Sequence, residues 1–489
     1  MDLGLEIRPC YLNATLLIAL VMGLYAWRSY RKCPVRTPPI VSLTEDERKN
    51  DLLEALERQI QQYGPVIGLR RDGRVEYIVS DELTPQVLTD DAVFSFELGI
   101  AKILNLEFLR TLFGNSIFHD IDSVVNTLLT KHLDTMIHRV SPIFERNMAE
   151  LLESHSEDSI SFLTHLQRTD IIQSFDRDIV VDTAEGVAEL IGTFRSRSML
   201  AQYFPVLWQI VTWMKVVIYK VVIRFGLAFG PLIWKQTSAA LQDSNKKSLK
   251  PDISLLRILV QTSGATNGRI TLSSRLWICG LVVMFIFASV HQTVSITMWT
   301  IFQLALRSEY QDIIRREIHD LTGRDSSSPI PISELDMRTL RKASRTDSFI
   351  REVLRTKGDA VNLVRMARRD VQMGDYIVPK GSLVLPLVSL SNHSPRYNDG
   401  DPKKFDGMRW VEKQKAASTT DPGHLSFGLG RWACPGRFLA VAEIKLAVFA
   451  LLADMRLELV GGVYDVADKF NITGNPPEGE LVFKRISVR

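Results

Sequence analysis

Cys434 follows a glycine-rich loop and directly precedes an apolar stretch with helical periodicity. The loop runs Phe427-Gly-Leu-Gly-Arg-Trp-Ala-Cys-Pro-Gly436. Pro435 suits the first position of a helix, where its missing N–H costs nothing. At such a helix N-terminus the dipole and the free backbone N–H groups favour a thiolate, and Arg431 adds a cation nearby. A thiolate held in this way is a metal ligand or a nucleophile. The apolar positions that recur at helical spacing after it, and that are predicted to be buried, are Phe438, Ala442, Leu446 and Phe449.

Polar side chains interrupt a second apolar stretch, residues 276–307, which is predicted to form one long helix. His291, Gln292 and Thr293 stand together there, directly after the small residues Ala288 and Ser289. Side chains of these three types, with ordered water, can pass protons to a bound reactant. The alternative is that His291 only hydrogen bonds to a neighbouring carbonyl.

Glu352 and Arg355 lie three residues apart on a helix predicted to begin near Thr346. Side chains at this spacing share one helix face, so the two charges can pair. Taken alone, this is an ordinary surface pair.

The pattern Phe-x-x-Gly-Arg-x-x-Cys-x-Gly resembles the haem-binding signature of the cytochrome P-450 superfamily, the haem-thiolate monooxygenases. The resemblance implies that Cys434 is the axial ligand of the iron of haem b. It further implies that Phe427 packs beside the ring and that Arg431 and Arg365 face the propionates. His119 stands in the region where the family carries a haem-contacting Trp or His. An ordinary buried cysteine in a glycine-rich turn is the alternative.

The same resemblance gives roles to the other two motifs. Glu352, Arg355 and Arg409 would form a buried charge network that holds the cysteine loop in place, and such a network is costly unless every member is paired. Residues 276–307 would be the family's central helix, whose usual pattern is small-small-x-acid-Thr. This sequence departs from that pattern, with His291 at the acid position and Gln292 at the Thr position. Some filamentous-fungal relatives look similar.

Periodicity predicts a mainly α fold with a minor antiparallel β component, and the resemblance implies that this is the cytochrome P-450 fold. No linker or repeat divides residues 34–489, so we expect one catalytic domain. Short strands are predicted at 66–70 and 75–79 around Asp72-Gly73, within 363–388, and near the C-terminus. The formal net charge of +3 is too small to indicate nucleic-acid binding, and four cysteines do not make a disulfide framework.

Residues 11–27 are almost entirely apolar and are followed at once by Arg28, Arg31 and Lys32. We expect residues 1–33 to be a single-pass anchor in the endoplasmic reticulum membrane, with the catalytic domain in the cytoplasm. A cleaved signal peptide is the alternative. Residues 203–234 are apolar and aromatic with three basic residues. They are predicted to form a lipid-facing surface from which the basic side chains snorkel, although their length alone would allow a second span.

The resemblance implies a monooxygenase that hydroxylates or epoxidises a lipophilic substrate with O2. Electrons would come from NADPH through NADPH-cytochrome P-450 reductase, with cytochrome b5 as an additional donor, since the chain has no dinucleotide-binding fingerprint. The departures on the central helix favour a fungal secondary metabolite of terpenoid type, and indole-derived or polyketide scaffolds stay open. The residues predicted to line the substrate pocket are Phe285, Ala288, Val361, Leu363, Val364 and Ile472.

Three other functions compete with this one. A haem-thiolate isomerase or dehydratase would need no reductase, and the absent Thr at position 292 keeps it open. A hydrolase would use Cys434 as its nucleophile, but no His and Asn/Asp signature accompanies it. A non-catalytic membrane binding protein would have no need of the haem ligand.

Overall fold

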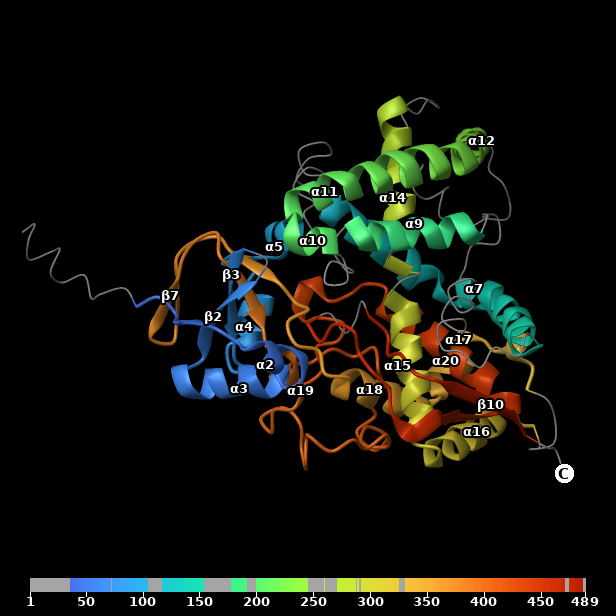
Figure 1. Ribbon diagram of the computed structural model, residues 1–489. Coiled ribbons are helices and arrows are strands. Elements are labelled where there is room, and N and C mark those ends of the chain that lie inside the picture. Colours follow the sequence, from blue (N-terminus) through green and yellow to red (C-terminus); the bar gives the residue numbers. More distant parts are fainter. Residues whose placement is uncertain are drawn as a thin grey trace, which may run out of the picture.

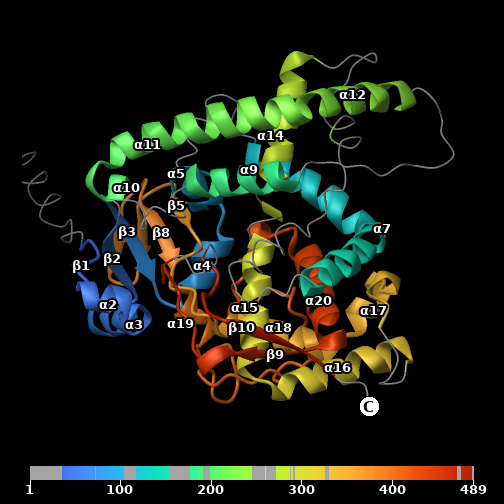
Figure 2. The same cartoon turned by 45° about the vertical axis from the view of Figure 1, so that its right-hand side comes forward.

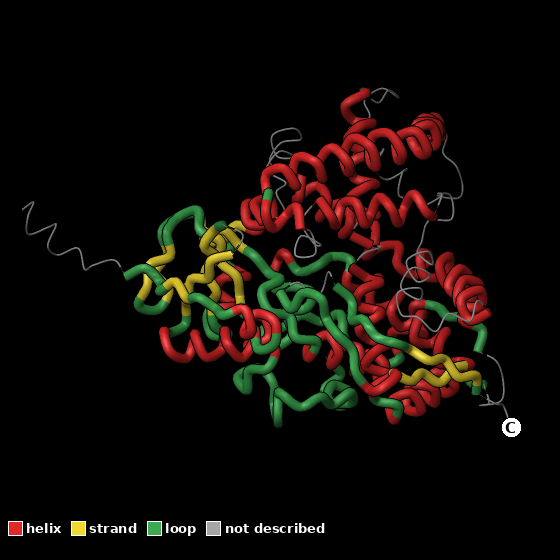
Figure 3. The backbone as a smooth tube through the Cα atoms, in the orientation of Figure 1, coloured by secondary structure: helices red, strands yellow, loops and turns green. Residues whose placement is uncertain are grey.

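The computed structural model describes residues 36–71, 73–103, 117–153, 177–190, 199–244, 259, 271–286, 288–289, 292–324, 330–470 and 475–486. The predicted anchor, residues 1–33, lies outside this part of the chain. The predicted fold class is confirmed, because helices make up most of the described structure and the strands gather mainly at one end (Figure 3).

The N-terminal part builds a small mixed sheet flanked by helices (Figure 1). Its elements are β1 (Ile40–Val41), α2 (Glu45–Lys49), α3 (Leu52–Tyr63), β2 (Val66–Arg71), β3 (Arg74–Val79), α4 (Thr84–Thr89), β4 (Phe94–Ser95) and α5 (Phe96–Ile103). β2 and β3 form the predicted hairpin, with Val66 opposite Val79 and with Gly73 at a φ of 77° in the turn. A positive φ of this kind favours glycine.

Four more short strands come from the predicted β region after residue 363. They are β5 (Arg365–Ala367), β6 (Val371–Met373), β7 (Tyr376–Val378) and β8 (Leu383–Pro386), followed by α19 (Val388–Asn392). β8 and β5 complete a six-stranded sheet in the order β1-β2-β3-β8-β5-β4, while β6 and β7 pair separately. Most pairings are antiparallel, but β1–β2 and β3–β8 are parallel. Because β5 and β4 adjoin in this sheet, Arg365 is brought close to the start of α5.

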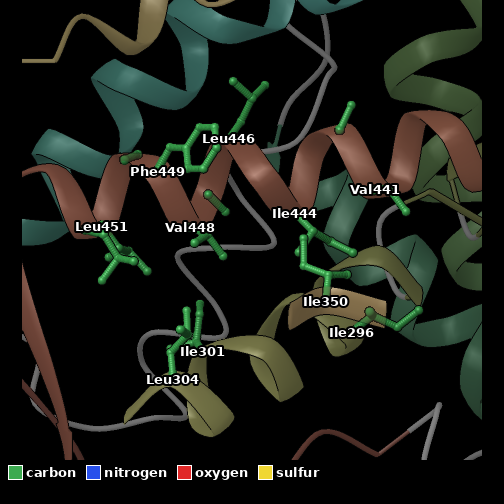
Figure 4. Packing of buried hydrophobic residues seen from close by; sticks show 14 of the residues in the cluster. Ile296, Ile301, Leu304, Ile350, Val441, Ile444, Leu446, Val448, Phe449 and Leu451 are labelled. Atoms are coloured by element: carbon green, nitrogen blue, oxygen red, sulfur yellow. The ribbon is translucent and has the colours of Figure 1, made fainter. Parts of the chain in front are cut away.

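The central helices bury the largest core. They are α15 (Gln292–Leu306), α16 (Glu309–Thr322), η4 (Ile332–Glu334), α17 (Met337–Lys342), α18 (Ser344–Thr356), η5 (Gly430–Trp432) and α20 (Arg437–Asp454). Apolar side chains of α20 meet those of α15 and α18, as Ile444, Ile350 and Ile301 illustrate (Figure 4). The hairpin of β9 (Met455–Leu459) and β10 (Leu481–Arg485), with η6 (Val460–Gly462) between them, closes this end of the molecule.

The apolar face predicted for the helix after Cys434 is correct except at its first position. Ala442, Leu446 and Phe449 are buried, whereas Phe438 is 37% exposed. Phe438 lies in the first turn of α20, beside the open side chain of Cys434, and the Arg437 guanidinium stacks on its ring at 4.4 Å. A side chain in the first turn of the helix can therefore point toward the loop and away from the core.

The remaining helices cover one side of this core (Figure 2). They are α7 (Ile117–Glu153), α9 (Arg177–Leu190), α10 (Met199–Tyr203), α11 (Pro205–Trp213), η2 (Met214–Phe225), α12 (Gly226–Ser244) and α14 (Leu272–Ile286). The long helix predicted over 276–307 is present as α14 and α15, with Ala288 and Ser289 in a π-helical turn between them. Π-helical turns occur often at functional sites.

Glu317 of α16 caps the N-terminus of α18 from a neighbouring helix. Its carboxylate accepts the backbone N–H groups of Arg345 and Thr346 at 2.7 and 2.8 Å, and the Thr346 hydroxyl at 2.6 Å. The residue before α18, Ala343, offers no side-chain cap of its own. A distant carboxylate thus satisfies donors that would otherwise lack a partner.

We expect Glu317→Ala to lower the free energy of unfolding by about 1–3 kcal/mol, because two buried N–H groups lose their acceptor. Urea unfolding measures this change. Asp320→Ala is the matched control, since Asp320 lies on the same helix, is largely exposed and makes only a 3.8 Å ion pair. Equal effects of the two substitutions would contradict the capping role.

Candidate functional site

The loop before Cys434 is held by its own backbone. The Cys434 N–H donates to the Phe427 carbonyl at 2.7 Å, and the Phe427 ring is buried. Gly430 has a φ of 71°, and a Cβ there would come within 3.3 Å of the Leu88 carbonyl and 3.0 Å of Thr89. Glycine is therefore needed both for the turn and for the close approach of the loop to α4.

The Cys434 side chain is exposed, yet burial raises the pKa of its thiol. The N–H groups of Gly436 and Arg437, and the Arg437 charge, oppose this effect without overcoming it. The N–H groups of the helix N-terminus thus favour the thiolate, as predicted, but burial outweighs them, and the cation that acts on the sulfur is Arg437 and not Arg431. Pro435 precedes α20 by two residues.

Arg365 is a buried guanidinium without an acidic partner. It is 2% exposed, and its Nη1 and Nη2 donate to the carbonyls of Val364 and Leu88 at 2.9 and 3.3 Å. Its Nε has no acceptor, and within the described residues it makes no ion pair. Burial lowers its pKa to about 10, although Asp91 acts in the opposite direction. A buried cation of this kind is stabilised when an anionic group of a ligand meets it.

Two aromatic rings connect this arginine to the cysteine loop. Phe96 and Trp432 stack with their centroids 4.8 Å apart and their planes 21° apart. The Arg365 guanidinium lies 5.2 Å from the Phe96 ring, and that of Arg431 lies 5.1 Å from the Trp432 ring. The sequence did not indicate this ladder, because Phe96 is more than 300 positions from its partner. The pairing of β4 with β5 brings Phe96 to Arg365, and the packing of η5 against α4 brings Trp432 to the same place.

The structure says less about the other two predicted haem contacts, Arg431 and His119. Arg431 is exposed next to the loop, in a position where a ligand could still approach it. His119 falls within the backbone of α7, but its side chain lies outside the described residues. The geometry therefore brings Cys434, Phe427, Arg431 and Arg365 together and leaves His119 as a prediction.

The predicted proton relay lies at the start of α15. Gln292 is half-buried and Thr293 is buried, while His291 lies outside the described residues. Among the described residues no hydrogen bond joins either side chain to the cysteine loop. Ser289 donates its hydroxyl to the Phe285 carbonyl at 2.8 Å, which satisfies that hydroxyl within the helical turn.

The predicted pocket lining divides into three groups. Val361 and Val364 are buried in the core around α3 and β2, so they support the site from behind. Leu363 is half-buried against Leu88 and Leu429 of the loop region, and Phe285 is half-buried. Ala288 is exposed. Ile472 lies outside the described residues.

Glu352 of α18 is the centre of the predicted charge network. It is fully buried and accepts two bonds from Arg355 at 2.9 and 2.7 Å, and one from Arg409 at 3.1 Å. The Asp406 N–H and the Trp410 indole N–H each donate to it at 3.0 Å. Burial disfavours the carboxylate, but these donors outweigh that effect and hold the pKa of Glu352 below its ordinary value.

The two arginines of this network also hold the irregular chain that leads to Cys434. Arg409 donates to the carbonyls of Asp399, Asp401 and Lys404 at 2.9, 2.9 and 2.7 Å. Arg355 donates to those of Asn392 and Pro402 at 2.9 and 2.5 Å. Sequence spacing predicted the three charged members but not these backbone acceptors, since irregular segments leave no periodic pattern.

A second buried arginine extends this arrangement and was not predicted. Arg351, one turn before Arg355, pairs with Asp421 at 2.7 Å and stacks on Trp410 at 4.7 Å. It also donates to the carbonyls of Ala416 and Thr419. The only signal in the sequence was its four-residue spacing from Arg355 on a helix predicted to be buried.

The family model described as cytochrome P450 matches residues 33–482. The chain belongs to the cytochrome P450 family. Among similar proteins, cytochrome P450 monooxygenase 3 of Gibberella fujikuroi is 32% identical over 195 residues, which is 35% of this chain and 37% of that protein. Cytochrome P450 monooxygenase ltmQ of Epichloe festucae var. lolii is 32% identical over 187 residues, 36% of this chain and 33% of that protein.

A mammalian protein is similar to the same degree. The mitochondrial cholesterol side-chain cleavage enzyme of Mesocricetus auratus is 31% identical over 192 residues, 39% of this chain and 35% of that enzyme. The matched part of this P450 spans only about a third of the length of these relatives.

Membership of this family implies a haem cofactor and O2, and the described residues fit a haem. Cys434 offers a sulfur with an open side, as an axial ligand requires. Arg365 offers a buried, unpaired N–H for a carboxylate such as a propionate. Phe427, buried beside the loop, offers an apolar contact to the ring.

We expect Glu352→Ala and Arg355→Ala each to leave little folded, haem-loaded protein. Removing one partner leaves a buried charge uncompensated, which costs about 3–5 kcal/mol. The measurement is the haem-to-protein ratio of the soluble or membrane fraction after expression.

Glu45→Ala is the control for this pair of variants. Glu45 also forms an ion pair within one helix, with Lys49 at 3.0 Å, but both side chains are highly exposed. Such a pair contributes about 0–1 kcal/mol, so its loss should not change haem content. Normal haem content in both network variants would contradict the role given to Glu352.

Proposed function

We propose that this P450 is a haem-dependent monooxygenase that hydroxylates or epoxidises a lipophilic secondary-metabolite intermediate. The observation that carries the proposal is the exposed side chain of Cys434, which follows the irregular segment that Glu352 and its arginines hold in place. Relatives named as fungal monooxygenases support the reaction class. Haem, when bound, supplies the oxygen and electron chemistry, and the chain supplies ligands, orientation and protons.

The chain divides these tasks among distinct groups. Cys434 would bind the iron, and Arg365 and Arg431 would hold the propionates from the side of the Phe96–Trp432 stack. Gln292 and Thr293, with His291, would hold and pass the protons that O2 reduction consumes. His119 is a further candidate contact to the haem. Electrons would come from NADPH through NADPH-cytochrome P-450 reductase, with cytochrome b5 as an additional donor.

A terpenoid-type scaffold is the substrate class we propose. The substrate named by the Mesocricetus auratus relative, cholesterol, is lipophilic, which supports an apolar substrate here. The half-buried apolar side chains of Phe285 and Leu363 agree with this class. Indole-derived and polyketide scaffolds are the alternatives that a substrate panel would separate.

We propose that residues 1–33 anchor the protein in the endoplasmic reticulum membrane, with the catalytic domain in the cytoplasm. A second contact would come from the segment Val206–Lys235. In the described chain it is the one helix long and apolar enough to cross a membrane, and 22% of its most apolar window is buried. A core helix would be mostly buried, so a surface against lipid suits this segment.

A hydrolase that uses Cys434 as nucleophile is disfavoured by the raised pKa of its thiol. A nucleophilic cysteine needs a thiolate at neutral pH and is usually found with a lowered pKa. A haem-thiolate isomerase or dehydratase remains the alternative that the departures at His291 and Gln292 support, because such reactions need no protons for O2 reduction.

The activity test is NADPH-dependent oxidation of a panel of terpenoid, indole and polyketide substrates by the full chain and reductase, with isotopically labelled O2. We expect one labelled oxygen atom in the product, and none with Cys434→Ala. Product formed without NADPH or O2 would favour the isomerase or dehydratase and contradict the proposal.

We expect Thr293→Val to lower the product formed per NADPH by about tenfold or more and to raise hydrogen peroxide release, because fewer protons reach the reacting oxygen. Gln292→Leu should act in the same direction. Thr300→Val is the control, since Thr300 is buried two turns later and its hydroxyl bonds only the Ile296 carbonyl. Unchanged coupling in both variants would remove Gln292 and Thr293 from the relay.

A further inference from the structure

Three helical segments, α11, η2 and α12, follow one another without a loop and lie along α9 (Figures 1 and 2). The residues on both sides of η2 keep right-handed helical angles, Trp213 at a φ of −61° and Gly226 at −62°. Residues 203–234 contain only three ionised side chains, Lys215, Lys220 and Arg224. All three belong to η2.

Each of these cations is paired with an acid of α9. Lys215 lies 3.0 Å from Glu189, and Lys220 and Arg224 lie 2.8 and 2.6 Å from the two oxygens of Asp182. The two acids are seven residues apart, two turns of an α-helix, so they share one face of α9. The charged groups therefore turn toward acids of the protein, partners that the sequence did not indicate. We call these contacts the η2–α9 ion-pair row.

The spacing of the cations fits a π-helix and not an α-helix. On an α-helix, which turns by about 100° per residue, side chains nine residues apart point in roughly opposite directions. Lys215 and Arg224 are nine residues apart and face the same helix. They can do so because η2 has the wider π turn, in which the Gly226 N–H reaches back five residues to the Val221 carbonyl.

The apolar side chains of η2 show the same repeat. Val216 and Phe225, also nine residues apart, are 0% and 3% exposed and pack toward the protein. Gly186 of α9 allows the close approach, because a Cβ there would lie 2.7 Å from Cδ of Lys220 and 3.4 Å from Val216. The ion pairs and the apolar contacts therefore both fit a π-helical repeat over the twelve residues of η2.

The outward face of this rod is apolar. It presents exposed side chains such as Ile210, Val222, Leu227 and Trp234. In an α-helical register Lys215 would move to this face while Lys220 and Arg224 stayed near α9. A lysine at the centre of a bilayer is costly, so the register decides how well the face tolerates lipid.

We propose that the η2–α9 ion-pair row holds η2 in its π-helical register, and that this register keeps charge away from the outward face, which rests on a lipid bilayer. A bilayer is the occupant that fits, because it requires a long apolar surface and no complementary charge. The most apolar window of this rod has a mean hydropathy of 1.8. The proposal rests on the membrane attachment proposed above and states how this chain builds the second contact.

The test is a nitroxide scan of positions 213–226, leaving out the three cations, in the full chain reconstituted into phosphatidylcholine nanodiscs. Cys10, Cys33 and Cys279 are replaced by serine, and any signal from label on Cys434, measured in the protein without a new cysteine, is subtracted. Accessibility to O2 reports lipid, and accessibility to a water-soluble nickel reagent reports solvent. We expect Ile218, Val222 and Ile223 to face lipid, and positions 216 and 225 to be protected together.

Variants of the ion-pair row separate the register from the membrane contact. Asp182→Asn with Glu189→Gln should shift the accessibility pattern to a 3.6-residue repeat, so that 216 and 225 are no longer protected together. Glu189→Lys should also disturb it, and adding Lys215→Glu should restore the wild-type pattern by exchanging the charges.

Each outcome of these experiments tests a different part of the proposal. A 3.6-residue repeat in the wild type, or a π repeat that survives neutralisation of both acids, would overturn the role of the ion-pair row. A π repeat whose outward positions meet the nickel reagent would overturn the lipid contact alone. Failure of the full chain to enter nanodiscs would overturn the proposed membrane attachment, and the repeat could still be measured in solution.

Discussion

The carboxylate of Glu352 is the fixed point on which the placement of Cys434 depends. It is buried and charged, and five donors from two segments of the chain converge on it. A charge in this environment is stable only while its partners stay in place. The segments that carry those partners, α18 and the chain around Arg409 and Trp410, are thereby fixed relative to each other.

The buried charge of Glu352 explains how a long irregular segment can hold Cys434 in a defined position. Between α19 and η5 the chain has no regular helix or strand, so its carbonyl groups need donors from elsewhere. Arg355, Arg409 and Arg351 supply them, each bonding two or three backbone carbonyls. Guanidinium groups suit this task because they carry several donors in one rigid plane. These hydrogen bonds therefore hold the cysteine loop in a fixed position relative to α18.

The helices, the strands and the cysteine loop could be predicted from the sequence, because each leaves a local pattern of residues. The β2–β3 hairpin follows from Asp72-Gly73 between apolar runs, and Glu352 with Arg355 follows from helical spacing. The Phe96–Trp432 stack and the acceptors of Arg351 could not be predicted, since their partners are distant in the chain and meet only through sheet pairing and loop packing.

Two sequence-based predictions differ from the structure in detail, each for a physical reason. The thiolate of Cys434 was expected from its position before a helix, but burial outweighs the helix terminus and raises the pKa of the thiol. The cations of η2 were expected to snorkel from a lipid-facing surface, and their acidic partners on α9 were not predicted. A π-helical register, which periodicity alone does not indicate, gathers them on one face against Asp182 and Glu189.

The bond from Cys434 to iron is tested most directly by the difference spectrum of the reduced, CO-bound protein. The account predicts the red-shifted Soret band of a thiolate-ligated haem in the wild type, and its loss in Cys434→Ala while the protein stays folded by circular dichroism. A wild-type protein that remains colourless when supplied with haem, or a Cys434→Ala variant with an unchanged band, would contradict it.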